Sequence, residues 1–201
     1  MKRLVFALAL AGAALPAAAQ QPGARQAPKE TMQILDEPGR VSTEEVTIDE
    51  GPFARQVVFF RSTEAPGTIV IHTGQRFLHV VMSGNRALRY GIGVGREGFQ
   101  WSGLVKVTRK AEWPDWTPPP EMIQRQPYLP RFMAGGPGNP MGARALYLGS
   151  TIYRIHGTNQ PETIGHAVSS GCFRLANVDV IDLFERVPVG TKVIIRHGPQ
   201  V

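Results

Sequence analysis

The chain has one cysteine, Cys172, in the segment HAVSSGCFRL, and His156 lies sixteen residues before it. A cysteine becomes a nucleophile when its thiolate is stabilised and a base lies close to it. Gly171 permits a tight turn before the cysteine, and the successive amides of Ser170, Gly171 and Cys172 could point at one oxyanion. Arg174 could pair with a substrate carboxylate or raise the local positive potential. This pattern indicates nucleophilic attack by a thiol on a carbonyl group.

A lone cysteine also allows other interpretations. In an oxidising compartment it cannot form an internal disulfide, so it is a small buried hydrophobe, a partner for another chain or a reactive thiol. A cysteine and a histidine at this spacing also occur together by chance. The residues alone leave these alternatives open.

The N-terminus predicts an oxidising compartment. Lys2 and Arg3 precede an apolar run over residues 4–15, and three alanines at positions 17–19 form a small-residue cleavage site. The run is shorter than the roughly 20 residues that a membrane-spanning helix needs. We therefore expect residues 1–19 to be a signal peptide and the mature chain to be an exported, soluble protein of the periplasm or cell envelope that does not span the membrane.

Composition limits the remaining possibilities. Without Lys2 and Arg3, 20 basic residues stand against 16 acidic ones, so the net charge falls from +6 to +4. The chain has no basic run with interleaved aromatic residues, so we expect no nucleic-acid partner. Residues 20–55 lack periodicity and are expected to form a proline-containing tether, with a short strand at residues 46–48. Residues 56–198 are long enough for one domain with a core.

The domain is expected to be mainly β with one or two short helices. Runs of β-branched and aromatic residues predict strands at residues 57–60, 68–72, 76–82, 87–94, 151–156 and 191–196. Asn177 is expected to cap a helix in which Val180, Leu183 and Val187 recur at helical spacing. His72 and His79 lie on expected strands, where we assign them to the surface or to packing.

The segment over residues 110–144 contains eight prolines and is expected to be a long loop. Four aromatic residues argue that this loop is ordered, because such side chains gain little unless they pack. They would hold the loop on the sheet or face a substrate. These residues are Trp113, Trp116, Tyr128 and Phe132.

No metal or organic cofactor is expected. The acidic residues show neither an HExxH motif nor the paired spacing of a carboxylate site, so the sequence predicts no metal site. Gly91, Gly93 and Gly95 are spaced like a dinucleotide-binding motif, but no helix begins after them.

The segment IHGTNQPETIGHAVSSGCFRLANVDVIDLF resembles the signature of the YkuD-type L,D-transpeptidases. That signature is an I-H-G-T segment, a loop, S-H-G-C-[IVF]-R-[ML] and a helix with apolar spacing. The resemblance extends over residues 68–196 and includes the GQRFLHVV hairpin, the GVG turn, the PGNPMG stretch and the VPVGTKVII strand. It implies a mainly β catalytic domain, a sandwich or barrel, that acts on peptidoglycan.

Carried over by position, the resemblance implies roles for individual residues. Cys172 would be the nucleophile, His156 the general base, and the Gly157 carbonyl the group that orients the imidazole. The amides of residues 170–172 would form the oxyanion hole, and Arg174, Ser169 and Thr158 would bind substrate. The thiolate would attack the amide before the terminal D-alanine of a stem peptide, and an amine would resolve the thioester. That amine would come from a second stem or from an envelope protein.

One position departs from the family pattern, because Ser170 stands where the family has histidine. Since the matching base is the earlier histidine, His156, we expect the change to alter the polarity of the pocket and the choice of donor or acceptor more than it removes activity. Two other functions stay open. Water could resolve the thioester, giving a carboxypeptidase or cross-link hydrolase, or the chain could be a non-catalytic peptidoglycan-binding module.

Overall fold

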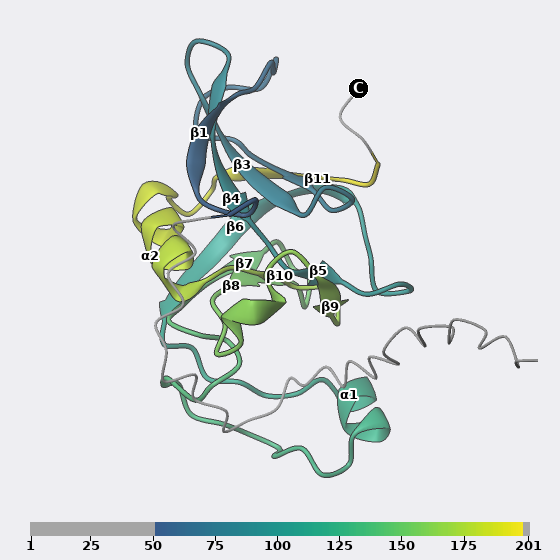
Figure 1. The fold of residues 1–201 in the computed structure, drawn as a ribbon. Helices are drawn as coiled ribbons and strands as arrows, with labels where there is room; N and C mark the ends of the chain where they lie inside the picture. The colour runs from purple at the N-terminus through teal and green to yellow at the C-terminus, as the bar shows by residue number, and fades with distance from the viewer. Residues whose placement is uncertain (1–50, 199–201) are drawn as a thin grey trace, which may run out of the picture. The chain divides into compact units, whose positions relative to one another are not determined.

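The computed structural model of the protein describes residues 51–198 (Figure 1). The expected signal peptide, the expected strand at residues 46–48 and most of the expected tether lie outside these residues. Within them are eleven strands, two α-helices and one 3-10 helix. The expected mainly β fold with one or two short helices is therefore confirmed.

Nine strands form one sheet, and two more form a small parallel pair. The sheet runs in the order β1 (Gln56–Phe59), β4 (Arg86–Gly91), β3 (Phe77–Met82), β2 (Ile69–His72), β11 (Lys192–Arg196), β6 (Gly103–Glu112), β7 (Arg144–Leu148), β8 (Arg154–His156) and β10 (Phe173–Arg174). The pair consists of β5 (Val94–Gly95) and β9 (Ala167–Ser169). Both pairs of strands that meet near the cysteine, β8 with β10 and β5 with β9, are parallel.

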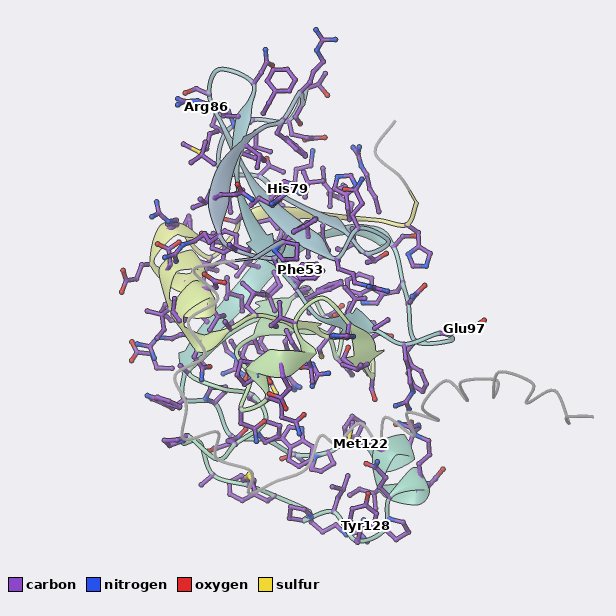
Figure 2. All side chains as sticks on the ribbon, viewed as in Figure 1. Phe53, His79, Arg86, Glu97, Met122 and Tyr128 are labelled. Carbon is purple, nitrogen blue, oxygen red and sulfur yellow. The ribbon has the colours of Figure 1, made fainter. Side chains whose placement is uncertain are left out.

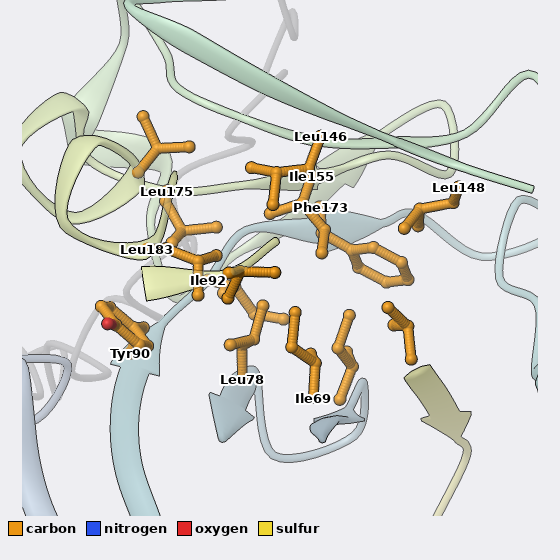
Figure 3. Close-up of a cluster of buried hydrophobic side chains, with 14 of the residues drawn as sticks. Ile69, Leu78, Tyr90, Ile92, Leu146, Leu148, Ile155, Phe173, Leu175 and Leu183 are labelled. Atoms are coloured by element: carbon orange, nitrogen blue, oxygen red, sulfur yellow. The ribbon is translucent and has the colours of Figure 1, made fainter. Parts of the chain in front are cut away.

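The main core lies between the two ends of the large sheet. Ile69 on β2 and Leu78 on β3 are fully buried in the same cluster as Leu146, Ile155 and Phe173 from β7, β8 and β10. Figure 3 shows these two groups facing each other across the core. A sheet that packs one end against the other buries the alternate residues of both ends, which is the arrangement of a sandwich.

The first strands also bury part of their other face. Val70, Val81 and Ala87 alternate with the residues of the main core, and they pack with Phe60 in a second, smaller cluster. Because this sheet end is covered on both faces, all four residues of β2 are buried. That double burial explains the continuous apolar run in the sequence.

The long proline-rich segment is shorter than expected at both ends. Strand β6 continues to Glu112 and β7 begins at Arg144, so part of the expected loop belongs to the sheet. Within the segment, α1 (Pro120–Arg125) begins with a proline, which suits the first turn of a helix. The strand β6 itself was not expected over residues 103–109.

A separate apolar cluster orders this segment. Trp116, Met122, Leu129 and Met141 are buried together against Ala145 of β7. Of the four aromatic residues expected to pack, only Trp116 is buried. The other three are exposed to the extent of 42 % for Trp113, 68 % for Tyr128 and 58 % for Phe132. The segment therefore depends on methionine and leucine side chains more than on the aromatic residues.

Helix α2 (Asn177–Arg186) is present as expected, but its cap is not. The N-cap residue is Ala176, and no side chain caps the helix, so the prediction that Asn177 is the N-cap is wrong. Val180 and Leu183 are buried in the main core, and the helix packs beside β7 (Figure 1). The Asn177 side chain instead accepts hydrogen bonds from the amides of Ala143 and Thr158.

The packed domain begins a few residues before the expected boundary at residue 56. Phe53 packs on Phe77 with ring centroids 5.4 Å apart. The guanidinium of Arg55 lies 3.4 Å from Asp179 and 3.3 Å from Asp182 on α2. These contacts attach residues assigned to the tether to both β3 and α2.

Two buried histidines pack on the second face of the first strands. His79 stacks on Phe60 at 4.5 Å, and His72 meets His79 edge-on at 5.5 Å. Burial, as the main cause, and the neighbouring His72 and Arg89 together lower the pKa of His79 to about 4. Burial, together with Arg196, also lowers the pKa of His72. Both imidazoles are therefore neutral packing groups near pH 7.

The depressed pKa of His79 predicts a loss of stability in mild acid. Between pH 6.5 and about 4, His79 is protonated in the unfolded chain and neutral in the folded chain. Its contribution to the free energy of unfolding is complete above pH 6.5. This contribution is lost as the pH falls through the window, by up to about 1.4 kcal/mol per pH unit. We expect His79→Phe to remove this contribution, measured by urea unfolding at about pH 7 and pH 5.

The control for this experiment is His166→Gln, because His166 is exposed. This variant should keep the pH dependence of the parent chain. An equal pH dependence in the parent chain and in His79→Phe would contradict the prediction.

Candidate active site

The parallel pairing of β8 with β10 brings His156 and Cys172 to one face of the sheet. Ile155 lies beside Phe173, and His156 lies beside Arg174. Ile155 and Phe173 both point into the main core. Since successive side chains of a strand point to opposite faces, His156 and Arg174 point away from that core, and so does Cys172, directly before the strand.

The imidazole of His156 is held by the backbone directly after it. Its Nδ1 lies 2.6 Å from the carbonyl oxygen of Gly157, so Nδ1–H donates to that oxygen. This hydrogen bond selects the tautomer in which Nε2 accepts a proton. The orienting contact expected from Gly157 is thus present in the structure.

The surroundings of His156 keep it neutral. Burial, as the main cause, and the charges of Arg174 and Arg154 together lower the pKa of His156 to about 3. The hydrogen bonds with the backbone of Gly157 and Met141 act in the opposite direction and are outweighed. A neutral imidazole is the form that can take a proton from a thiol.

The turn before Cys172 is tied together by Ser169. The Ser169 hydroxyl donates to the carbonyl of Cys172 at 2.6 Å and accepts from the amide of Gly171 at 3.2 Å. Gly171 has φ +109°, and a Cβ there would lie 2.4 Å from the ring of Tyr153. Glycine is required at this position both for the backbone angle and for the space.

Three of the expected site groups have other contacts. Ser169 and Thr158, expected to bind substrate, are buried, and their hydroxyl groups bond to the backbone of their own turns. The amide of Gly171, expected in the oxyanion hole, donates to Ser169 instead. These groups shape the turns on either side of the cysteine and histidine.

Arg174 is buried beside His156, with 2 % of its surface exposed. Its backbone pairs with Gly93 through two hydrogen bonds of 2.8 and 2.9 Å, which fix β10 from the side away from β8. Its charge is the second cause, after burial, of the depressed pKa of His156. The structure therefore places a permanent positive charge next to the histidine.

Asn177 joins the histidine turn to the end of the long segment. Its Oδ1 accepts from the amide of Ala143 at 2.9 Å and from the amide of Thr158 at 3.3 Å. Space at this junction is small, because a Cβ on Gly142 would lie 2.4 Å from the nitrogen of Thr158. The side chain expected to cap α2 thus holds the segments before β7 and after β8 together.

The long segment covers the same sheet face that carries His156. Ala145 lies directly opposite His156, and Tyr147 opposite Arg154, and both pack with the apolar cluster of this segment. Figure 2 shows Met122 and Tyr128 of this segment on the other side of β8 and β10 from His79. The segment therefore lies against the sheet face that carries His156.

Sequence reasoning missed four residues around the site. The Trp101 side chain bonds the Gly171 carbonyl, and Tyr153 closes the space beside Gly171. Asn139 bonds three backbone groups in the turn before Met141, and Arg154 adds charge near His156. Asn139 is followed by Pro140, and this pair is a turn signal that could have predicted the turn at residues 139–141.

No group of three or more histidine, cysteine, aspartate or glutamate side chains within residues 51–198 is arranged to hold a metal ion. None of the helices in this range has the length and apolar character needed to cross a membrane.

Known proteins resemble this chain in sequence. The family model of the L,D-transpeptidase catalytic domain, YkuD, matches residues 66–195. The probable L,D-transpeptidase ErfK/SrfK of Escherichia coli K12 is 39% identical over 150 residues, which cover 72% of this chain and 48% of that protein. The probable L,D-transpeptidase YbiS of the same organism is 43% identical over 135 residues, covering 62% of this chain and 43% of that protein. The chain thus spans about half the length of these relatives.

Solved structures share the fold. L,D-transpeptidase 3 of Mycobacterium tuberculosis has a TM-score of 0.53 at 16% identity, covering 66% of this chain and 62% of that chain. The catalytic domain of the L,D-transpeptidase from E. faecium, solved acylated by ertapenem, has a TM-score of 0.51 at 19% identity. That match covers 67% of this chain and all of that chain.

The Asn177 junction predicts a loss of stability when its acceptor is removed. Asn177→Ala leaves two amides, those of the buried residues Ala143 and Thr158, without the oxygen that they bond. An unsatisfied buried donor costs about 1–3 kcal/mol, so we expect the variant to lose about 2–4 kcal/mol of unfolding free energy. The matched control is Asn177→Asp, which keeps an acceptor oxygen at the same position. Equal losses in the two variants would show that the acceptor is not what holds the junction.

Proposed function

Because the chain belongs to the family of L,D-transpeptidase catalytic domains, we propose that it is an exported cysteine L,D-transpeptidase acting on peptidoglycan stem peptides. The observation that carries this proposal is the placement of His156 and Cys172 on one face of the β8–β10 pair. The hydrogen bond from His156 Nδ1 to the Gly157 carbonyl supports the role of this histidine as a base.

In the first step, Nε2 of His156 takes the proton of the Cys172 thiol, and Sγ attacks the carbonyl carbon before the terminal D-alanine. The carbonyl becomes a tetrahedral oxyanion, and the C–N bond then breaks. The imidazolium returns its proton to the nitrogen of the leaving D-alanine. The stem is left as a thioester on Cys172.

In the second step, an amine from another stem or from an envelope protein attacks the thioester. His156 takes a proton from this amine, the C–S bond breaks, and the imidazolium returns the proton to the departing thiolate of Cys172. A new amide bond joins donor and acceptor. The energy of the original peptide bond is kept in the thioester, so the reaction needs no further source of energy.

The first step needs a neutral imidazole. Burial and the charges of Arg174 and Arg154 keep His156 neutral, which leaves Nε2 able to accept a proton. When the thiolate forms beside it, the new negative charge favours the imidazolium. The buried charge of Arg174 favours the thiolate by the same argument, and we assign Arg174 this role together with attraction of the donor carboxylate.

The oxyanion donors in this mechanism are the amides of Ser170 and Cys172. The Gly171 amide is excluded from the hole because it bonds the Ser169 hydroxyl. Ser169 and Thr158 do not contact the substrate in this mechanism; they stabilise the turns next to Cys172 and His156. Ser170 contributes its amide and a small polar side chain. The residue that replaces the family histidine is therefore outside the proton path.

The function is tested with purified tetrapeptide muropeptides and mass spectrometry. Release of D-alanine together with a cross-linked dimer would support transfer to a second stem. Release of D-alanine with only tripeptide products would make the chain a carboxypeptidase. Binding without any product, in the parent chain as in Cys172→Ala, would reduce it to a peptidoglycan-binding module.

Acylation by a carbapenem separates the roles of Ser170 and His156. Ser170→Ala should keep the acylation rate within about tenfold of the parent chain, a barrier change of about 1.4 kcal/mol or less. His156→Ala should lose far more, because it removes both thiol activation and the proton for the leaving group. The adduct is measured by its mass shift with time.

Cys172→Ala is the control, since it cannot form the adduct. If Ser170→Ala and His156→Ala were equally inert while both stayed folded, Ser170 would be a chemical participant and the assignment of roles would be wrong.

A further inference from the structure

Trp101 reaches the cysteine turn from a distant part of the chain. It lies between β5 and β6, and its indole Nε1–H donates to the carbonyl of Gly171 at 3.0 Å. Gly171 is the residue directly before the cysteine. The hydrogen bond therefore acts on the peptide group that joins Gly171 to Cys172.

The indole is fixed in its own position. Its ring stacks on Tyr153 with centroids 4.6 Å apart and planes 14° apart. Its other contact is Phe173, at 5.7 Å and 38°, and the side chain packs against the main core. A ring held by two aromatic neighbours points its N–H in one direction.

The hydrogen bond from Trp101 also affects the N–H of Cys172, because the Gly171 carbonyl and this N–H belong to one peptide group. In a trans peptide, the carbonyl and the following N–H lie in one plane and point in opposite directions. No cis peptide bond occurs among the residues that the structure describes. Trp101 holds the Gly171 carbonyl, so it also directs the N–H of Cys172 to the opposite side.

The next peptide group is held as well. The Ser169 hydroxyl donates to the carbonyl of Cys172 at 2.6 Å. Both peptide groups of Cys172 are therefore held by a hydrogen bond, one at the Gly171 carbonyl and one at its own carbonyl. A donor fixed in this way needs little reorganisation when charge develops on a substrate oxygen.

We propose that Trp101 is a positioning residue that orients and strengthens the Cys172 amide as an oxyanion donor. This inference rests on the proposed function. A hydrogen bond to the carbonyl polarises the peptide group and makes its N–H a better donor. Trp101 acts through this peptide group, by its hydrogen bond to the Gly171 carbonyl.

The test uses Trp101→Phe, which keeps an aromatic ring beside Tyr153 and removes the N–H. Acylation by a carbapenem passes through an oxyanion, whereas alkylation by iodoacetamide displaces iodide and forms none. We expect the acylation rate constant to fall about tenfold, since loss of a whole oxyanion donor costs roughly 10²–10³. The affinity for the carbapenem and the rate of alkylation should change less than about twofold.

Two variants complete the comparison. Trp113→Phe makes the same change at an exposed tryptophan and should leave both reactions unchanged. Benzothienylalanine at position 101 keeps the two-ring shape with sulfur in place of the N–H, and it should reproduce the loss. Equal losses in acylation and alkylation, or no loss in either, would overturn the proposal.

A measurement on the amide itself distinguishes this proposal from the function on which it rests. The Cys172 ¹⁵N–¹H resonance should shift in Trp101→Phe and stay in place in Trp113→Phe. An unmoved resonance overturns the proposal even if the parent chain is acylated. A shifted resonance in a chain that no carbapenem acylates would mean that the geometry stands but the proposed function fails, and the catalytic role of Trp101 fails with it.

Discussion

The site depends on the parallel pairing of two very short strands. In β8 and β10, Ile155 beside Phe173 fills the core, and this fixes His156 and Arg174 on the opposite face. A shift of either strand by one residue would turn the histidine or the cysteine into the core. Gly93 secures β10 from its other side through two backbone hydrogen bonds. Apolar burial therefore sets the register on which the chemistry depends.

Two apolar clusters pack on opposite faces of the sheet, the second of them on β7, which is the neighbour of β8. The main core lies behind β8 and β10, and the cluster around Trp116 and Met141 covers β7 on the face that carries His156. Asn177 joins the two regions through the amides of Ala143 and Thr158. The imidazole sits between these layers, which explains its burial and its low pKa. The proline-rich segment is thus a structural part of the site as well as its border.

The sequence predicted those strands whose apolar residues are buried in the structure. Strands β2 and β3 are apolar and buried on both faces, and the sequence marked both. Strand β6 was missed because most of its ten residues are exposed and several are charged, so its pairing with β11 and β7 has no local signature. The roles of Asn177 and Trp101 come from partners up to 34 and 70 residues away. Cap and turn patterns depend only on residues adjacent in the sequence. They therefore predicted a cap at Asn177 and gave no indication of a role for Trp101.

The cysteine turn is assembled from segments that are far apart in the chain. Trp101 bonds the Gly171 carbonyl from 70 residues away, and the His156 carbonyl accepts from the amide of Leu175, directly after β10. Neither contact exists until the sheet has closed on itself. A newly made or partly folded chain therefore carries a thiol with the modest reactivity of free cysteine. A thiol activated by these neighbours, as proposed above, therefore gains its reactivity only once the long-range contacts have formed. The same dependence makes thiol reactivity a direct chemical report on whether a given molecule has finished folding.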